Sequence, residues 1–203
     1  MSSASFARSV VTAPQLAIHV PHASRGAQLG SWAAAAWIAL GAESILRPQQ
    51  HNYRDALWLI PFLLSVATFC YLHASQRSSS SKIERYGFYA VLVASLLAIL
   101  GNVGVLTGIR QLAVFGFPWG AVVWTVGLIA YGIGTWRAKI LPRYVALALI
   151  LLEPGSILTG LALAPISPLH DRGAYSAGIE KGLVLAILAM GMRSLSGRRS
   201  ASP

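Results

Sequence analysis

A carboxylate interrupts one of the apolar stretches of the chain. The stretch LALILLEPGSILTG, residues 147–160, carries Glu153 directly before Pro154 and Gly155. A charged side chain at the centre of a bilayer costs about 2.5–3.5 kcal/mol on insertion scales, so this carboxyl must be protonated or paired and must avoid lipid. We expect Glu153 either to hold a proton or a ligand, or to act as a buried acid that fixes helix packing.

The residues around Glu153 predict a kinked helix with a small, polar inner face. Pro154 has no N–H, so the carbonyl of Ile150 loses its helical partner, and Gly155 makes a local bend easier. Ser156 follows Glu153 by three residues and therefore shares its face of the helix. We expect this face to line protein or a small hydrated cavity.

Lys181, in the next apolar segment, is the expected partner of Glu153. That segment descends from the opposite side of the membrane, which places Lys181 about 12 Å below the predicted start of its helix. At this depth its ammonium group can meet the Glu153 carboxylate. In the alternative arrangement, Lys181 extends outward to water beside Glu180 and Asp171.

A second polar cluster is expected on the outer side. It would combine the end of the first apolar segment with the loops QQHNYRD, residues 49–55, and SPLHDRG, residues 167–173. Its members are Glu43, His51, Asp55, His170 and Asp171. Their spacing matches no known metal or catalytic motif, so we interpret them as solvated loop residues, with a metal or catalytic site as the alternative, and expect no bound metal.

The composition indicates a membrane protein. The chain has 203 residues, of which 55% are hydrophobic and only 11% are charged, whereas a soluble domain has about 25% charged residues. The net charge of +10 comes from short basic clusters between apolar runs, where anionic lipid headgroups are the expected neighbours. The single cysteine, Cys70, excludes an intramolecular disulfide and a CxxC redox pair.

Six apolar windows predict six transmembrane helices. A helix needs about 20 apolar residues to cross a bilayer, and the candidate windows are residues 26–42, 56–76, 86–109, 111–136, 144–170 and 173–192. We therefore expect an all-α integral membrane bundle over residues 29–195. A basic tail, residues 1–28, would precede it, and a disordered tail, residues 196–203, would follow.

The basic residues orient this arrangement. With six spans, eleven Lys and Arg residues fall on the side of the two termini and four on the other side, with Lys181 inside a span. Cytoplasmic loops carry the excess of Lys and Arg, so both termini are expected in the cytoplasm. The expected membrane is a bacterial inner membrane, or an organellar membrane if the acid-poor residues 1–28 are a transit peptide.

Small residues predict where the helices meet. Without a hydrophobic driving force in lipid, helices associate through small side chains that allow close backbone approach. Gly101, Gly104 and Gly108 repeat at three- and four-residue steps in the third window, and similar stripes occur in the fourth and sixth. Asn102 lies beside this stripe and is expected to hydrogen-bond to a neighbouring helix, or to contact a ligand if it faces Glu153.

The stretch GLIAYGIGTWRAKILPRYVALALILL, residues 127–152, resembles a pattern common in small, uncharacterised multi-spanning bacterial membrane proteins. In that pattern a helix ends in basic residues, the tripeptide LPR follows, and the next helix opens at once. The resemblance implies a cytoplasmic turn with Pro142 near the start of the second helix, where its missing N–H costs little. It implies no activity and no functional residue.

Short loops and the lack of a soluble catalytic domain favour a non-enzymatic accessory or assembly subunit of a membrane complex. One alternative is a small transporter or proton-coupled carrier centred on Glu153. Another is an intramembrane enzyme with Glu153 as general acid on a lipidic substrate. The expected partners are membrane lipids, including anionic headgroups, and other membrane subunits or further copies of this chain. Nucleic acid and cofactors are not expected.

Overall fold

The computed structural model describes residues 20–49, 53–166 and 175–197, and these residues form helices and no strand. The six long helices are α1 (Val20–Leu46), α3 (Leu59–Gln76), α4 (Lys82–Thr107), α6 (Ala121–Ala138), α7 (Arg143–Leu163) and α8 (Gly178–Gly197). Four short helical segments connect some of them: α2 (Tyr53–Leu57), η2 (Arg77–Ser79), α5 (Arg110–Val114) and η3 (Phe115–Gly120). The predicted all-helical architecture is confirmed for the described residues.

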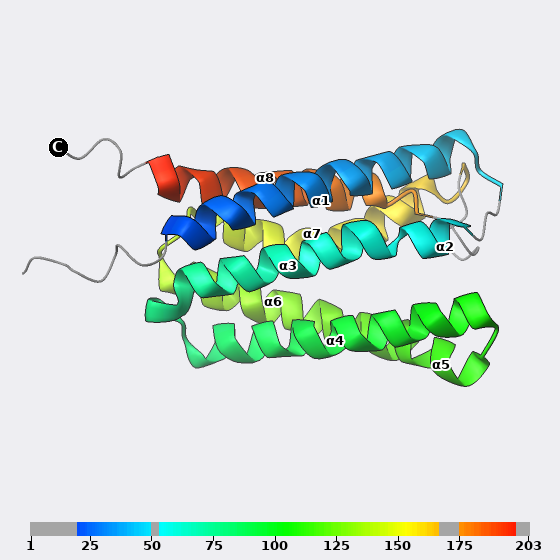
Figure 1. The fold of residues 1–203 in the computed structure, drawn as a ribbon, viewed down its shortest axis with the longest axis horizontal. Helices are drawn as coiled ribbons and strands as arrows, with labels where there is room; N and C mark the ends of the chain where they lie inside the picture. The colour runs from blue at the N-terminus through cyan, green and yellow to red at the C-terminus, as the bar shows by residue number, and fades with distance from the viewer. Residues whose placement is uncertain (1–19, 50–52, 167–174, 198–203) are drawn as a thin grey trace, which may run out of the picture.

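The long helices lie side by side and alternate in direction (Figure 1). Their contacts close into a ring in the order α1, α3, α4, α6, α7 and α8, because α8 packs against both α7 and α1. The contact between α3 and α4 is the sparsest in this ring. The interior of the ring therefore receives side chains from every long helix.

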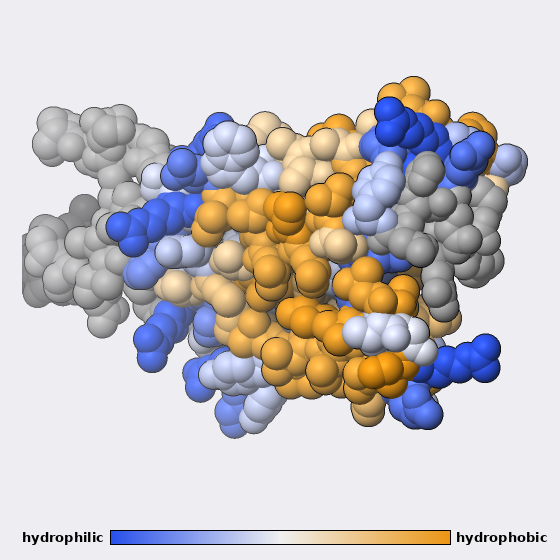
Figure 2. Space-filling model, turned by 45° about the vertical axis from the view of Figure 1, so that its right-hand side comes forward, coloured by the Kyte–Doolittle hydropathy of each residue, from blue (hydrophilic) through white to orange (hydrophobic). Residues whose placement is uncertain are grey.

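Five segments of the described part of the chain are long and apolar enough to cross a membrane. They are His22–Leu46, Tyr53–Gln76, Lys82–Thr107, Arg110–Ala138 and Arg143–Leu163. The α8 helix has a similar length, 20 residues, but carries Glu180, Lys181 and Arg193. On the face that Figure 2 shows, an apolar band lies between two hydrophilic ends, as a membrane-spanning bundle requires.

The two ends of the described chain lie at the same end of the bundle (Figure 1). The turns between α3 and α4 and between α6 and α7 lie there too. This basic end carries Arg25, Arg77, Lys82, Arg85, Arg137, Lys139, Arg143 and Arg193, whereas Arg47, Arg54 and Arg110 lie toward the opposite, outer end. Pro142 is the N-cap of α7, at the position that the LPR turn predicts.

The first helix begins earlier than the sequence analysis predicts. Residues 20–28 belong to α1 and not to a tail, and Ala23 and Ala27 are 1% exposed. Pro21 is tolerated in the first turn of a helix, and small side chains let this part of α1 pack closely on its neighbours. A window that opens after the exposed Arg25 therefore begins too late. Residues 1–19 and 198–203 lie outside the described residues.

The fourth predicted window is not one continuous helix. It divides into α5, η3 and α6, and Phe117 has the extended backbone angles φ −139° and ψ 127°. A residue before proline is pushed away from the helical region, and Pro118 follows Phe117. By contrast, α7 continues as one helix through Pro154 and Gly155, so the predicted kink does not interrupt it.

The predicted small-residue seams lie between helices of this chain, except that Gly108 caps α4 at φ 75° and its Cβ position meets no other described residue. A Cβ at Gly104 would overlap the backbone of Leu112 and Ala113 in α5, and Gly101 meets the backbone of Gly116 in the same way. Other glycines on α6, α7 and α8 meet neighbouring helices at similar separations. These stripes therefore hold the ring together from within.

Candidate functional site

A partly open cavity of about 140 Å³ lies among the helices of the ring. Its lining residues are Trp37, Trp58, Phe62, Ser65, Ala98, Gly116, Gly120, Ala121, Trp124, Leu152, Glu153, Lys181 and Leu185. All six long helices and the broken segment η3 contribute to the wall, with Trp58 just before α3. An apolar cavity of about this volume holds benzene, so the space suits a small organic molecule.

One side of the cavity carries the ion pair that the sequence predicts. The Nζ atom of Lys181 lies 2.9 Å from the Oε2 atom of Glu153, and both side chains are largely buried, at 22% and 13% exposed. The same ammonium group lies 5.4 Å from the centre of the Trp37 ring, within the range of a cation–π interaction. Lys181 therefore points inward and does not extend to water.

Glu180 is a second carboxyl near this contact, whereas the sequence analysis considered it only in the arrangement that extends outward to water. A Cβ at Gly155 would overlap the Glu180 carboxyl, so this side chain packs against α7 two residues beyond Glu153. Its Oε2 atom is buried and has no hydrogen-bond partner among the described residues. The ion pair thus has a second carboxyl near it, and of the two carboxyls only Glu153 lines the cavity.

Glu180 was missed because consecutive residues point about 100° apart on a helix. The long side chains of two consecutive residues can still both reach a neighbouring helix, one from each side of the line along which the two helices touch. The available signal was Gly155, because a glycine opposite a charged residue leaves room for its carboxyl group.

An aromatic wall completes the cavity. Trp58 stacks on Phe62 with ring centres 4.2 Å apart, and Phe62 lies 5.2 Å from Trp124. The indole N–H of Trp37 donates to the Ser65 hydroxyl at 3.0 Å, so its ring orientation is fixed and its polar group is satisfied. The sequence analysis did not predict these residues as a site, since their convergence depends on how α1, α3 and α6 pack.

Two other predicted site residues do not line the cavity. Ser156 is buried on α7 just beyond Glu153, and Asn102 donates from Nδ2 to the backbone oxygen of Asp55 at 2.9 Å. The interhelical hydrogen bond predicted for Asn102 is therefore present, but its partner is α2 and not Glu153. Of the four predicted ligand or pathway residues, the structure brings together only Glu153 and Lys181.

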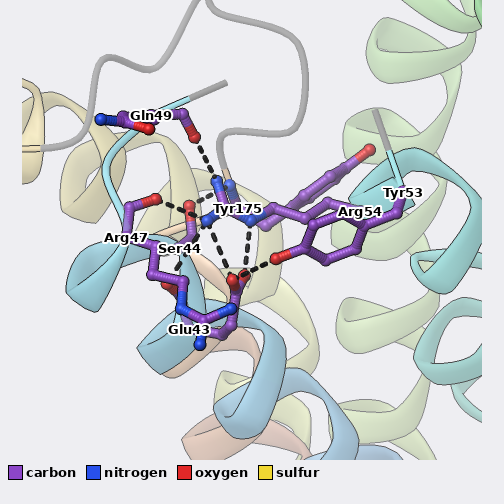
Figure 3. Close-up of polar contacts among 7 residues, drawn as sticks. All are labelled: Glu43, Ser44, Arg47, Gln49, Tyr53, Arg54 and Tyr175. Carbon is purple, nitrogen blue, oxygen red and sulfur yellow. Dashed lines mark hydrogen bonds and ion pairs between the residues drawn. The ribbon is translucent and has the colours of Figure 1, made fainter. Parts of the chain in front are cut away.

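At the outer end, Glu43 is organised by Arg54 (Figure 3). The Arg54 guanidinium, only 1% exposed, donates from Nη2 to the Glu43 carboxylate at 3.1 Å and also to the carbonyl oxygens of Arg47 and Gln49. The hydroxyl of Tyr53 donates to Glu43 as well. A positive charge at the C-terminus of α1 complements the helix dipole, so Arg54 closes this helix.

Asp55 belongs to a separate contact. Its carboxylate accepts a hydrogen bond from the Tyr175 hydroxyl at 2.6 Å, and the Tyr175 N–H donates to Ser44 at 3.0 Å. Burial and the neighbouring Asp55 carboxylate raise the pKa of Tyr175. Tyr175 therefore ties the chain entering α8 to both α1 and α2.

The predicted outer cluster is only partly described. Glu43 and Asp55 lie at the same end, each bonded to a different partner, while His51, His170 and Asp171 lie outside the described residues. Arg54 and Tyr175, which organise this end, were missed because they pair across loops whose course the sequence does not fix. Within the described ranges, no group of three His, Cys, Asp or Glu side chains could hold a metal ion.

Comparisons with known proteins identify no relative for this arrangement: no protein-family model matches the sequence, and no curated protein or solved structure matches it significantly. The cavity and its residues are therefore the basis on which a function is assigned.

Proposed function

We propose that the chain is an integral membrane protein with six spans and both termini in the cytoplasm, in a bacterial inner membrane. The α8 helix, at 20 residues, is about 30 Å long, enough to cross the hydrocarbon core. Its two charges near the start pack against α7 and inside the ring, not against lipid. The excess of Lys and Arg at the end that holds both termini supports the orientation.

Reporter fusions test this topology. A periplasm-dependent reporter should be inactive after residue 197 and active in the outer turn at residues 107–110, with a cytoplasm-dependent reporter giving the reverse pattern. Activity of the periplasmic reporter at residue 197 would mean an odd number of spans and would refute the proposal.

We propose further that the protein is a proton-coupled carrier of small organic cations. The observation that supports this function best is a cavity lined by all six long helices, with the Glu153–Lys181 ion pair in its wall and the Glu180 carboxyl packed against α7 near that pair. The excess of carboxyl over ammonium groups favours a cationic ligand. Four aromatic rings in the wall provide the faces to which organic cations bind.

Lys181 provides the switch in this proposal. Burying an unpaired carboxylate is costly, so Glu180 holds a proton while Lys181 pairs with Glu153. When Glu180 releases its proton, Lys181 turns to Glu180, and the Glu153 carboxylate becomes free to bind a cation in the cavity. Because a proton leaves as a cation arrives, the net charge of the site is unchanged, which lowers the cost of carrying the ligand through a low-dielectric interior.

The η3 segment is the proposed opening. Gly116 and Gly120 line the cavity, and Phe117 between them departs from helical geometry. Small side chains and an interrupted backbone ladder make this part of the wall easier to displace than a continuous helix. Movement here would expose the ligand without breaking the contacts of α1 with α8.

The other two candidate functions have less support. An accessory subunit needs a surface for a partner helix, but the small-residue stripes are used inside this chain and give no evidence of one. A lipid-modifying enzyme would need the Glu153 carboxyl as a proton donor, and that carboxyl is paired with Lys181. The proposed carrier, by contrast, requires the Glu153–Lys181 ion pair beside the cavity.

Flux in proteoliposomes tests the carrier. An outward-directed proton gradient across vesicles should drive uptake of a small aromatic amine such as benzylamine in the opposite sense to proton flow, at least about tenfold faster than without a gradient. Glu180→Gln should abolish this gradient dependence, while Ser156→Ala, buried on α7 but off the cavity wall, should retain it. If the flux does not depend on the gradient and is the same in the wild type and in Glu180→Gln, the carrier is ruled out.

A further inference from the structure

A second cavity, of about 520 Å³, lies at the basic end of the bundle, where α3 ends and α4 begins. His73, Arg77, Ser80, Arg85, Phe88 and Tyr89 line it. It shares no lining residue with the central cavity. Its chemistry is also different, because cationic side chains from two helices and their connection converge on it.

His73 is held in a defined orientation at this cavity. Its Nδ1 atom lies 2.7 Å from the Oε1 atom of Glu84, whose side chain is fully buried. The imidazole also stacks on Phe88, with ring centres 4.1 Å apart and planes 7° apart. Nδ1 is bonded to Glu84 and the ring stacks on Phe88, so Nε2 is the nitrogen left for a ligand.

Two arginines flank the same cavity. Arg77 lies in η2 and Arg85 in the first turn of α4, and both side chains are exposed. Among the residues that the structure describes, no carboxylate lies within ion-pair distance of either guanidinium. Their charges are therefore available to an anion.

The connection between the two helices is itself fixed. The Ser81 hydroxyl accepts a hydrogen bond from the Glu84 N–H at 3.2 Å, which caps α4. Capping of this kind holds the entry to a helix in one geometry. The positions of Arg77 and Arg85 around His73 are thus set by the backbone and not by a flexible linker.

We propose that this cavity binds the phosphate group of an anionic ligand. Each guanidinium presents a planar fork that matches two phosphate oxygens, and the Nε2–H of His73 can donate to a third. An amine would be repelled by the two arginines. Other basic residues at this end, such as Lys82 and Arg137, raise the local concentration of anions.

The phosphate could belong to an anionic lipid headgroup or to a soluble phosphate compound. Tyr89 and Phe88 give the cavity an apolar side next to its charges, which suits the junction between a headgroup and its acyl chains. The recognised chemistry is the same for both sources. The site is independent of the cation carrier, because it has its own residues and lies at a different place in the bundle.

Binding measurements on the purified full chain in neutral detergent test the proposal. Phosphatidylglycerol and inorganic phosphate are titrated separately at constant ionic strength, with phosphatidylcholine and chloride as the reference compounds. The double variant Arg77→Gln/Arg85→Gln should weaken binding at least about tenfold. The matched double variant Arg47→Gln/Arg110→Gln removes the same charge at the outer end and should change binding less than about twofold.

The outcomes separate the sources. Binding of phosphatidylglycerol alone identifies a lipid headgroup, binding of phosphate alone identifies a soluble ligand, and mutual competition identifies the phosphate group as the shared determinant. Circular dichroism checks that each variant is folded, and His73→Gln gives a second variant with the same expected loss. Binding of neither probe, or an equal loss in both double variants, would overturn the proposal.

Discussion

At the scale of single residues, the account depends on one ammonium group and two carboxyls. Lys181 bonds to Glu153 at 2.9 Å and contacts the Trp37 ring, while Glu180 lies close by without a hydrogen-bond partner for its buried Oε2 among the described residues. In a weakly polar interior an unpaired charge is far more costly than a paired one. Substitution by glutamine should therefore change the stability of the protein very differently at Glu153 and at Glu180.

Glu153→Gln should destabilise the protein, because it leaves the Lys181 ammonium without its partner. A fully buried pair loses about 3–5 kcal/mol when one member is removed, and partial exposure of both side chains reduces the expected loss to about 1–3 kcal/mol. Thermal unfolding in detergent measures this loss. The double variant Glu153→Gln/Lys181→Met should recover most of it.

Glu180→Gln is the matched control, since it removes a carboxyl that has no hydrogen-bond partner in the described part of the chain for its buried Oε2. We expect its unfolding temperature to equal or exceed that of the wild type. A loss as large as that of Glu153→Gln would mean that Glu180 is the paired acid, and would contradict the assignment of roles.

At the scale of helices and their junctions, the outer end is held by two separate networks. Arg54 closes the C-terminus of α1, and Tyr175 joins the entry of α8 to Asp55 and Ser44. Charged hydrogen bonds of this kind contribute about 1.5–3 kcal/mol each. These contacts set where α1 and α8 begin their antiparallel packing, and so set the position of Lys181 opposite Glu153.

Tyr175→Phe should lower the unfolding free energy by about 1–3 kcal/mol at neutral pH, because the Asp55 carboxylate loses a donor. The substitution should also change the response to alkali. Burial raises the pKa of Tyr175, so above about pH 10 the unfolded chain releases this proton while the folded protein retains it, and wild-type stability falls as the pH rises.

Denaturant unfolding in detergent between pH 8 and pH 11, at several pH values, measures this dependence; the range brackets the ordinary tyrosine pKa of about 10. The difference between wild type and Tyr175→Phe should shrink as the pH rises. A difference that stays constant across the range would contradict the burial of this phenol.

The helices themselves could be predicted from charge-free apolar windows, and their contacts from glycine spacing. The break at Phe117 was not predicted, although Pro118 gives the physical reason for it. The start of α1 was placed too late because an exposed Arg25 ends an apolar window without ending a helix. The Glu153–Lys181 pair could be predicted because only depth along two helices was needed. The aromatic wall and Arg54 could not, because they depend on the rotation of helices and the path of loops.

At the scale of the whole molecule, six helices close a ring, and all six line the central cavity. Closely packed helices normally leave little space between them, so a cavity beside an ion pair is a feature that a purely structural bundle does not need. The ring also gives the ligand a fixed aromatic wall on one side and a charge switch on the other. Filling the space should therefore abolish function while leaving the fold intact.

Ala98→Leu adds bulk at the cavity wall, whereas Ala39→Leu adds the same bulk at an exposed position of α1. We expect Ala98→Leu to weaken binding of benzylamine at least about tenfold, with a stability change smaller than the 1–3 kcal/mol typical of overpacking. Ala39→Leu should alter neither property. Isothermal titration with the purified variants measures the affinity, and equal affinity in both variants would place the ligand elsewhere.

Proton release on ligand binding tests the central claim most directly. Benzylamine binding to the purified protein is measured by calorimetry in buffers of different ionisation enthalpy, which counts the protons exchanged per ligand. The account predicts release of about one proton per amine in the wild type and in Ser156→Ala, and none in Glu180→Gln, whose affinity should fall at least about tenfold. Amine binding without proton release, with the same affinity in Glu180→Gln as in the wild type, would contradict it.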